Sequence, residues 1–433
     1  MNRFSASERL DAAFARIDDP KGEGSRACLT VYREAARAAA VAADARAKSG
    51  ISLGPLDGAI VSIKDLFDVA GEVTRAGSRL LAGEGKMAQA DAPVVQRLRA
   101  AGAVIVAKTN MSEFAFTGVG INPHFGTPGN PADRARAPGG SSSGAAVAAA
   151  DAMCDIAIGS DTGGSVRIPA SVCGIVGFKP SRQRVPTEGA FPLSYTLDSI
   201  GPMARSVADC ARADAVMAGI APWPLEPAPL AGLRVGIAQG VPLDNLDDTV
   251  GKRFPAGLAR LEKAGVRFSD EKLPLLDDMA KLLARTSILV AEVYSIHGER
   301  LARGGDAVDP IVRGRIEKGR EISAADYITT LRERARLIAA MDARLADLDV
   351  LVMPTTATVA PRLDEVADPK SFMARNALLL RNTTIGNFFD LTAISLPLPR
   401  EGGLPAGLML VARNGHDRCL LRIAAAVENV FAD

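Results

Sequence analysis

Apolar and polar positions alternate in two different periods along the first half of the chain. Apolar residues at helical spacing predict helices, and short runs rich in β-branched residues predict buried strands. The predicted helices cover residues 35–47, 94–101 and 144–150, and the predicted strands cover 59–63, 103–107 and 155–158. Because helix and strand follow one another in turn, the sequence predicts an α/β layered fold.

The second half continues this pattern after a proline-rich break at residues 221–229. A strand is expected to begin at Leu233, and amphipathic helices are expected near 277–300 and 324–348. A further strand at 350–353 and a closing helix at 417–430 complete the pattern. Such a break is compatible with either a domain linker or a surface loop.

Two glycine–serine segments carry the strongest chemical signal. Ser165 follows Gly163 and Gly164 within the run 159–170, and Ser141 lies in the run 139–144, upstream of it. Further upstream, Lys64 ends a short apolar strand. Together these residues can supply a nucleophile, a proton relay and a base without any histidine, which indicates a serine amidohydrolase.

These segments resemble the amidase signature family, whose serine, cis-serine and lysine triad corresponds to Ser165, Ser141 and Lys64. Residues 108–114 and 126–131 are similar to the family's linking motifs, so the resemblance spans most of the chain. It implies an α/β fold with a single large mixed β-sheet covered by helices on both faces. It also implies one domain over 1–433, with the signature core at about 55–210 and a substrate-pocket half at about 233–433. The proline-rich break is then a surface loop.

Amide hydrolysis requires a nucleophile, a proton acceptor and donors for the oxyanion. We expect Ser165 to be the nucleophile. The flexible glycines before it allow the backbone N–H groups of Thr162, Gly163, Gly164 and Ser165 to point into one concavity as an oxyanion hole. This chemistry needs no metal and no cofactor, and we expect none.

Lys64 must be neutral to accept a proton, which requires its pKa to fall by about three units from a reference of about 10.4. Burial beside Ile63 and Leu66 is expected to produce this fall. Local sequence does not distinguish Ser141 from Ser142 or Ser143 as the relay. The resemblance favours Ser141 and implies a cis peptide bond before it.

Further residues are candidates for supporting and binding roles. Asp161 and Arg167 lie on either side of the nucleophile segment, and an ion pair between them would brace it from behind. Thr117 is expected to line the acyl pocket. By resemblance, Arg334 falls where some relatives place an arginine for a substrate carboxylate, although a solvated helix face is the alternative.

Composition narrows the class of protein. The chain has 433 residues, with 51 Lys and Arg against 50 Asp and Glu, so no overall charge favours nucleic acid or an anionic membrane surface. Five scattered cysteines indicate neither a disulfide framework nor a zinc site. No apolar run is long enough for a membrane span. We therefore expect a cytoplasmic enzyme with a small-molecule amide substrate, either a homodimer or the companion of a small partner subunit.

Three other interpretations compete with a free amidase. Residues 140–144 match GxSxG, which would make Ser142 the nucleophile of an α/β-hydrolase esterase. Residues 102–109 nearly match a phosphate-binding loop, but their β-branched residues predict a strand. The glutaminase component of the tRNA-dependent amidotransferases is also similar to this family. We favour an amidase that forms an acyl-enzyme and releases ammonia or an amine.

Overall fold

The computed structural model describes residues 5–432, and its centre is one mixed sheet of eleven strands. The strand order is β1-β3-β2-β4-β6-β5-β10-β11-β9-β7-β8. The strands are β1 (Cys28–Val31), β2 (Ile60–Lys64), β3 (Val104–Thr109), β4 (Ile156–Asp161), β5 (Val176–Lys179), β6 (Ser199–Ala204), β7 (Arg234–Ala238), β8 (Arg267–Glu271), β9 (Val350–Pro354), β10 (Thr392–Pro397) and β11 (Gly407–Ala412).

Apart from the edge strand β1, which pairs with β3 in antiparallel fashion, strand directions divide the sheet into three parts. Strand β2 runs parallel to both β3 and β4, and β7 runs parallel to both β8 and β9. The strands between these two parallel groups pair in antiparallel fashion, from β4 with β6 through to β11 with β9. The sequence predicts the parallel strands β2, β3, β4, β7 and β9, which alternate with helices, but it predicts neither the parallel edge strand β8 nor the strands of the antiparallel middle.

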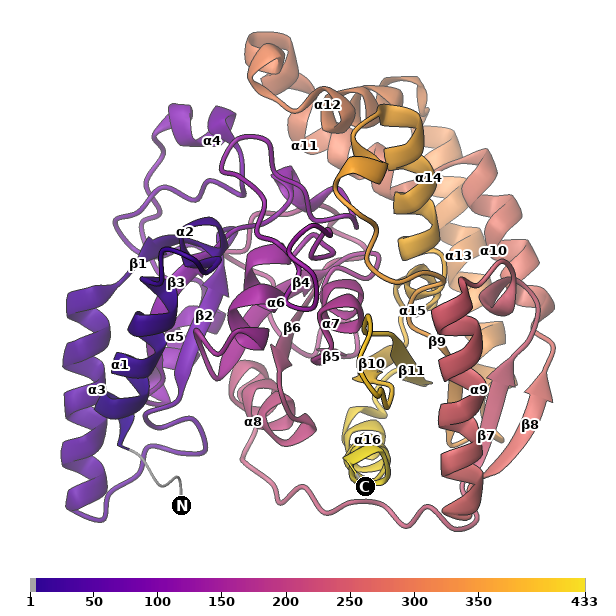
Figure 1. Cartoon of the computed structure of the whole chain (residues 1–433). Helices are drawn as coiled ribbons and strands as arrows, with labels where there is room; N and C mark the ends of the chain where they lie inside the picture. The colour runs from indigo at the N-terminus through magenta and orange to yellow at the C-terminus, as the bar shows by residue number, and fades with distance from the viewer. Residues whose placement is uncertain (1–4, 433) are drawn as a thin grey trace.

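Helices cover both faces of this sheet (Figure 1). The helices are α1 (Ala6–Ile17), α2 (Gly24–Ala27), α3 (Arg33–Lys48), α4 (Arg79–Glu84), α5 (Pro93–Ala100), α6 (Ser143–Ala150), α7 (Arg167–Cys173), α8 (Val207–Ala218), α9 (Asp248–Lys263), α10 (Pro274–Arg285), α11 (Ile288–Gly304), α12 (Pro310–Glu317), α13 (Ala324–Arg344), α14 (Pro369–Leu380), α15 (Thr383–Phe388) and α16 (Asp417–Ala432). This arrangement is the predicted α/β fold with a single large sheet.

Strand β2 shows how the chain builds its core on two faces. Val61 and Ile63 join one apolar cluster, with residues of α5 and α8, whereas Ile60 joins another with residues of α1, α3 and α6. Since side chains alternate along a strand, Lys64 continues the row of Ile60. The lysine therefore enters the layer in which α6 begins.

The amphipathic segment predicted near 277–300 forms two helices in the structure, α10 and α11. Helix α10 ends at Arg285, and Ser287 caps α11 by accepting a hydrogen bond from the backbone N–H of Val290. A serine that accepts from the third residue of a helix starts a new helix rather than continuing the old one. The other predicted elements lie within a few residues of their expected positions, apart from the helix expected to end at 348, which stops at Arg344.

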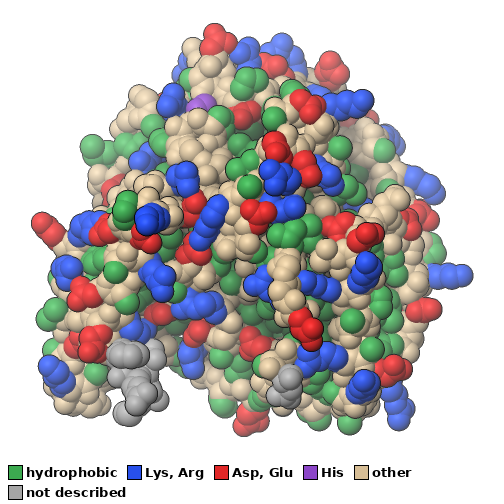
Figure 2. All heavy atoms as spheres, in the orientation of Figure 1, with side chains coloured by type: hydrophobic (Ala, Val, Ile, Leu, Met, Phe, Trp, Pro, Cys, Tyr) green, Lys and Arg blue, Asp and Glu red, His purple; other side chains and the backbone are tan. Residues whose placement is uncertain are grey.

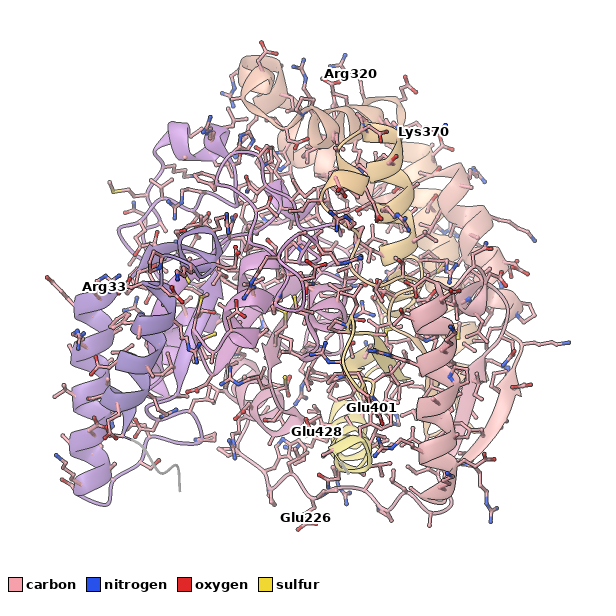
Figure 3. All side chains as sticks on the ribbon, viewed as in Figure 1. Arg33, Glu226, Arg320, Lys370, Glu401 and Glu428 are labelled. Atoms are coloured by element: carbon pink, nitrogen blue, oxygen red, sulfur yellow. The ribbon has the colours of Figure 1, made fainter. Side chains whose placement is uncertain are left out.

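The proline-rich segment joins α8 to β7 along the outside of the molecule, and Figure 3 shows Glu226 on it. Helix α16 holds this segment through Arg422, whose side chain donates to the Glu226 carbonyl at 2.9 Å. The carbonyl of Arg422 accepts in turn from the backbone N–H of Ala228, also at 2.9 Å. The segment therefore packs on the body of the protein.

Acidic and basic side chains are interspersed over the face shown in Figure 2, with no broad area of one sign. This mixture agrees with the near-balance of charge in the sequence. Among residues 5–432, no helix has the length and apolar character that crossing a membrane requires. All five cysteines are free; four are buried, and Cys419 is exposed on α16.

Candidate active site

Lys64 is completely buried at the end of β2, where its Nζ atom contacts two serines. The Nζ atom lies 2.7 Å from Ser141 Oγ and 2.9 Å from Ser160 Oγ. Ser141 belongs to the loop before α6, and Ser160 lies on β4, the parallel neighbour of β2. The sheet therefore brings together a base candidate and two hydroxyl groups from distant parts of the sequence.

Burial is the main cause of an unusual pKa at this lysine. Desolvation lowers the pKa of Lys64 to about 7, even though the carboxylates of Asp198 and Asp161 raise it. At neutral pH a large fraction of the side chain is therefore an uncharged amine, as a general base must be. The carboxylate of Asp65, the next residue, forms an ion pair with Arg75 at 3.1 Å and is not among the groups that raise the pKa of Lys64.

The loop that carries Ser141 is fixed by its backbone. The peptide bond between Gly140 and Ser141 is cis. The Ser141 carbonyl accepts from the N–H of Ser112 at 3.0 Å, and the N–H of Gly140 donates to the carbonyl of Gly118 at 2.8 Å. With both sides of the peptide held in this way, the hydroxyl of Ser141 has a defined position beside Lys64.

Ser165 lies in the loop between β4 and α7, close to the Ser141 loop. The backbone N–H of Ser142 donates to the Ser165 carbonyl at 3.3 Å, which joins the two loops. Among residues 5–432, the Ser165 hydroxyl makes no side-chain hydrogen bond, including none to Ser141. Catalytic hydrogen bonds are often loose or unmade before substrate binds, so this absence is compatible with a proton relay from Ser165 to Ser141.

Glycine is required at one position of the nucleophile loop. Gly164 has a φ of +136°, and a Cβ built there would lie 2.1 Å from Thr383 Oγ1. The Thr383 hydroxyl donates to the carbonyl of Gly163 at 2.6 Å, which fixes the direction of that peptide. Any side chain at Gly164 would therefore displace the loop from α15.

Behind the loop, Asp161 and Arg167 form a completely buried ion pair of 2.8 Å. Burial raises the pKa of Asp161, but the charge and hydrogen bonds of Arg167 outweigh it and lower the pKa to about 2. The same carboxylate accepts the backbone N–H groups of Val166 and Arg167 at 3.2 and 3.4 Å. Asn387 joins the pair by donating to Asp161 at 2.9 Å.

The Asp161 carboxylate accepts from the N–H groups of Val166 and Arg167 but not from those of the three residues before them. In the described part of the chain, the backbone N–H groups of Gly163, Gly164 and Ser165 donate no hydrogen bond. Free amides in successive residues of a glycine-rich loop form a concavity that suits an anion. These N–H groups, together with that of Thr162, are the donors expected to hold the oxyanion.

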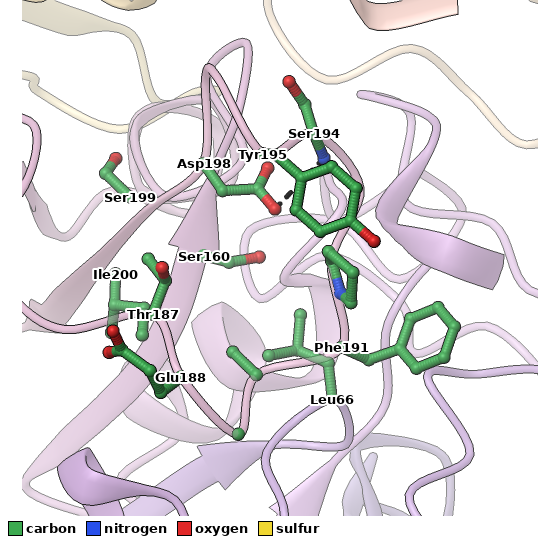
Figure 4. Close-up of a pocket in the computed structure, with 13 residues that line it drawn as sticks. Leu66, Ser160, Thr187, Glu188, Phe191, Ser194, Tyr195, Asp198, Ser199 and Ile200 are labelled. Atoms are coloured by element: carbon green, nitrogen blue, oxygen red, sulfur yellow. Dashed lines mark hydrogen bonds between the residues drawn. The ribbon is translucent and has the colours of Figure 1, made fainter. Parts of the chain in front are cut away.

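A cavity of about 310 Å³ reaches this site from the Ser160 side (Figure 4). Ser160 and Asp198 line it together with apolar side chains that include Leu66, Phe191 and Ile200. Ser165 is not among its lining residues, but its loop is linked to this wall. The link is Thr162, the first residue after β4, whose Oγ1 donates to Asp198 at 2.5 Å.

The two predicted substrate residues lie in different surroundings. Thr117 is buried and its hydroxyl donates to Ser112 Oγ at 3.0 Å, next to the Ser141 loop. Arg334, on α13, is also buried, and its guanidinium meets Asp390 at 2.5 Å and the Asn387 carbonyl at 3.0 Å. Asp390 balances the charge of Arg334, and Asn387 links it to the Asp161–Arg167 pair. The contact of Arg334 with substrate stays a prediction.

Sequence reasoning missed Ser160 and Asp198. Ser160 is part of the run around Ser165, but its proximity to Lys64 depends on the pairing of β2 with β4. Asp198 lies outside every motif considered, in the turn before β6. Burial raises the pKa of Asp198 to about 6, despite hydrogen bonds that lower it.

Within residues 5–432, the ring nitrogens of His297 have no hydrogen-bond partner. His297 packs against the rings of Phe114 and Phe191, at centroid distances of 4.0 and 5.6 Å, and desolvation lowers its pKa to about 3. No cluster of three or more His, Cys, Asp or Glu side chains that could hold a metal ion occurs within residues 5–432.

Comparison with known proteins identifies the class. The amidase family model matches residues 10–421, so the chain belongs to the amidase family, in which the signature enzymes are hydrolases of amide C–N bonds. It is 35% identical over 398 residues to 2-amino-5-chloromuconic acid deaminase of Comamonas testosteroni, covering 91% of this chain and 86% of that protein.

Two further similarities cover nearly the whole chain. A glutamyl-tRNA(Gln) amidotransferase subunit of Anaeromyxobacter sp. (strain K) is 35% identical over 464 residues, which cover 98% of this chain and 93% of that protein. A crystal structure of an amidase superposes with a TM-score of 0.87 at 32% identity, covering 99% of this chain and 96% of that one. The amidase signature fold expected from the sequence is thereby confirmed.

Proposed function

We propose that this protein is a carboxamide hydrolase in which Ser165 attacks the amide carbonyl and forms an acyl-enzyme. The observation that carries the proposal is the completely buried Lys64, 2.7 Å from Ser141, with a pKa lowered to about 7 by desolvation. A neutral amine in this position accepts a proton from Ser141, which in turn accepts one from Ser165.

The reaction then follows from the positions of these groups. Attack by Ser165 Oγ forms a tetrahedral intermediate, whose oxyanion is held by the free N–H groups of Gly163, Gly164 and Ser165. Lys64 returns its proton through Ser141 to the leaving nitrogen, so ammonia or an amine departs. Water then gives a proton through Ser141 to the neutral Lys64 and attacks the acyl carbon; as the bond to Ser165 Oγ breaks, Lys64 returns that proton through Ser141 to Ser165, and the carboxylic acid is released.

Substitution of Ser165 by alanine tests this proposal. Ammonia release from a panel of small carboxamides should fall to background in Ser165→Ala, and mass spectrometry of the quenched wild type should show an acyl adduct on the peptide containing Ser165. Normal turnover by Ser165→Ala would refute the assignment. The GxSxG alternative predicts that Ser142→Ala is the inactive variant.

A second candidate function is that of a glutaminase component of an amidotransferase. It is favoured by the 35% identity to the glutamyl-tRNA(Gln) amidotransferase subunit over 98% of this chain. The same chemistry would then deliver ammonia within a complex. Purification of the chain from its native source discriminates the two, because the second candidate requires a stoichiometric partner and glutamine-dependent activity, while a free amidase is active alone or as a homo-oligomer.

A further inference from the structure

A second cavity adjoins the one that reaches Ser160. Its volume is about 480 Å³, and it shares four lining residues with the first: Thr187, Glu188, Tyr195 and Asp198. The two cavities are therefore adjacent, and a substrate whose amide lies at the catalytic loops would extend through the first cavity towards the second. Whereas the first cavity is largely apolar, the second contains several charged side chains.

Three arginines line this second cavity: Arg97, Arg182 and Arg184. Arg184 is already paired with Asp214, at 2.7 Å. Within residues 5–432, neither Arg97 nor Arg182 has a carboxylate within 4.0 Å. Each donates instead to one backbone carbonyl, Arg97 to Met217 and Arg182 to Tyr195. Most of the hydrogen-bond donors of these two guanidinium groups are therefore available to a ligand.

Two acidic residues, Asp198 and Glu188, line the same cavity, and they differ in how many hydrogen bonds their carboxylates accept. Asp198 accepts hydrogen bonds from the Thr162 hydroxyl and from the N–H groups of Leu193 and Ser194, at 2.5, 2.9 and 3.1 Å. Glu188 is exposed and forms no ion pair in the described part of the chain. Of these two carboxylates, only Glu188 therefore lacks a hydrogen-bond or ion-pair partner within residues 5–432.

The loop beneath Arg182 is rigidly held. Glu292 accepts hydrogen bonds from Ser194, Thr196 and the hydroxyl of Tyr327, the last at 2.6 Å. Tyr195, between two of these residues, is 67% exposed, and its carbonyl accepts from Arg182 at 3.3 Å. Because this loop is fixed before any ligand binds, the Tyr195 carbonyl is a fixed acceptor for the Arg182 guanidinium. Figure 4 shows Tyr195 and Asp198 together on one side of the cavity.

We propose that Arg182, assisted by Arg97, binds a carboxylate at the far end of the substrate, so that the preferred substrates are amides of dicarboxylic acids. The planar guanidinium offers paired N–H donors that match a carboxylate. The apolar first cavity takes the carbon chain between the amide and the acid. This inference rests on the proposed amide hydrolysis, and it assigns a specificity that the catalytic residues alone do not provide.

Kinetics with two matched amides tests the proposal. Succinamate and butyramide have the same length and differ in a terminal carboxylate against a methyl group. In Arg182→Gln, KM for succinamate should rise about tenfold relative to that for butyramide, as expected for one lost charge-assisted hydrogen bond. Glu188→Gln should lower KM for succinamate, because it removes a repulsive charge. Arg332→Gln, which removes an exposed arginine of α13 outside these cavities, is the matched control.

Direct binding separates failure of this inference from failure of the proposed function. Calorimetry with succinamate and the Ser165→Ala protein reports on the cavity whether or not any turnover occurs. Adding Arg182→Gln to that protein should weaken binding by about tenfold, and adding Arg332→Gln should not. If Arg182→Gln leaves binding unchanged, or alters KM for the two amides equally, Arg182 does not recognise a carboxylate. If the wild type hydrolyses neither amide, the binding comparison still decides the question.

Discussion

Lys64 Nζ donates a hydrogen bond to Ser160 Oγ at 2.9 Å, in addition to its contact with Ser141. A neutral amine has two N–H donors and one lone pair. When one N–H points to Ser160, the lone pair is free to face Ser141, where the proton must arrive. Ser160 is therefore a positioning residue that sets the orientation of the base.

Ser160→Ala should lower kcat about tenfold with little change in KM, since one orienting hydrogen bond to the base is lost. The pH dependence of kcat should also shift, because the environment of Lys64 changes. Ser62→Ala is the matched control: Ser62 is buried and lies two residues before Lys64 on β2. Within residues 5–432, its hydroxyl forms a hydrogen bond only with Cys154 Sγ, at 3.4 Å. If Ser160→Ala and Ser62→Ala lower kcat equally, Ser160 contributes only packing and does not orient Lys64.

The Asp161–Arg167 pair provides a prediction about stability. Asp161→Asn leaves the buried Arg167 without its counter-charge and should lower the free energy of unfolding by about 3–5 kcal/mol. Urea denaturation followed by circular dichroism measures this change. As a control, Glu333→Gln breaks the exposed contact with Arg336 on α13 and should leave the denaturation midpoint nearly unchanged.

The same pair makes a pH prediction. The pKa of Asp161 is about 2 in the folded protein and near 3.9 when unfolded, so the ionised carboxylate stabilises the fold. This contribution should be complete above about pH 4 and should disappear as the pH falls through 2. In Asp161→Asn the corresponding part of the acid sensitivity should be absent; an unchanged acid-unfolding profile would contradict this origin.

Local patterns predict the parallel strands and the triad candidates, but not the contacts that depend on the sheet. Lys64 can be predicted to be buried because its strand is apolar, and Ser165 stands out because its glycines are unusual. Ser160 cannot be assigned from the sequence, since its distance from Lys64 follows from the pairing of β2 and β4, which local sequence does not encode. The antiparallel strands β10 and β11 are likewise absent from the sequence-based prediction.

Arg334 illustrates the same limit. From the sequence, an arginine on a polar helix could bind substrate or face solvent, yet in the structure it is buried against Asp390. The pairing partner comes from the loop after α15, 56 positions away, so no pattern within α13 reveals it. Interactions of this kind depend on the packing of whole elements rather than on local spacing.

Arg334→Ala therefore distinguishes two roles. If the ion pair with Asp390 is its main function, the substitution should lower the thermal midpoint and affect succinamate and butyramide alike. The substrate-binding role predicted from the sequence requires a rise in KM for succinamate alone. Asp390→Asn serves as the companion variant, because a structural pair should respond similarly to the loss of either partner.

The pH dependence of activity should report on Lys64. With a pKa of about 7, Lys64 is protonated and inactive at lower pH and neutral at higher pH, so kcat/KM should rise with a midpoint near 7. His297, which packs on Phe191 at the wall of the first cavity, should contribute no inflection there, because its pKa is about 3. Lys64→Ala should lose activity by about 10²–10⁴-fold, as expected for removal of a general base.

The Lys64→Arg variant distinguishes a role of Lys64 as general base from a role as a source of positive charge alone. Arginine keeps a cationic side chain of similar length but does not release its proton, so a correctly folded Lys64→Arg protein should be nearly as inactive as Lys64→Ala. Lys179→Arg is the matched control at another completely buried lysine, whose Nζ donates to the Pro180 carbonyl and whose pKa is lowered to about 8 by desolvation. That variant should keep the midpoint near 7. Substantial turnover by folded Lys64→Arg would show that Lys64 supplies only charge. A shift of the pH midpoint in Lys179→Arg would show that the titrating group is Lys179 and not Lys64.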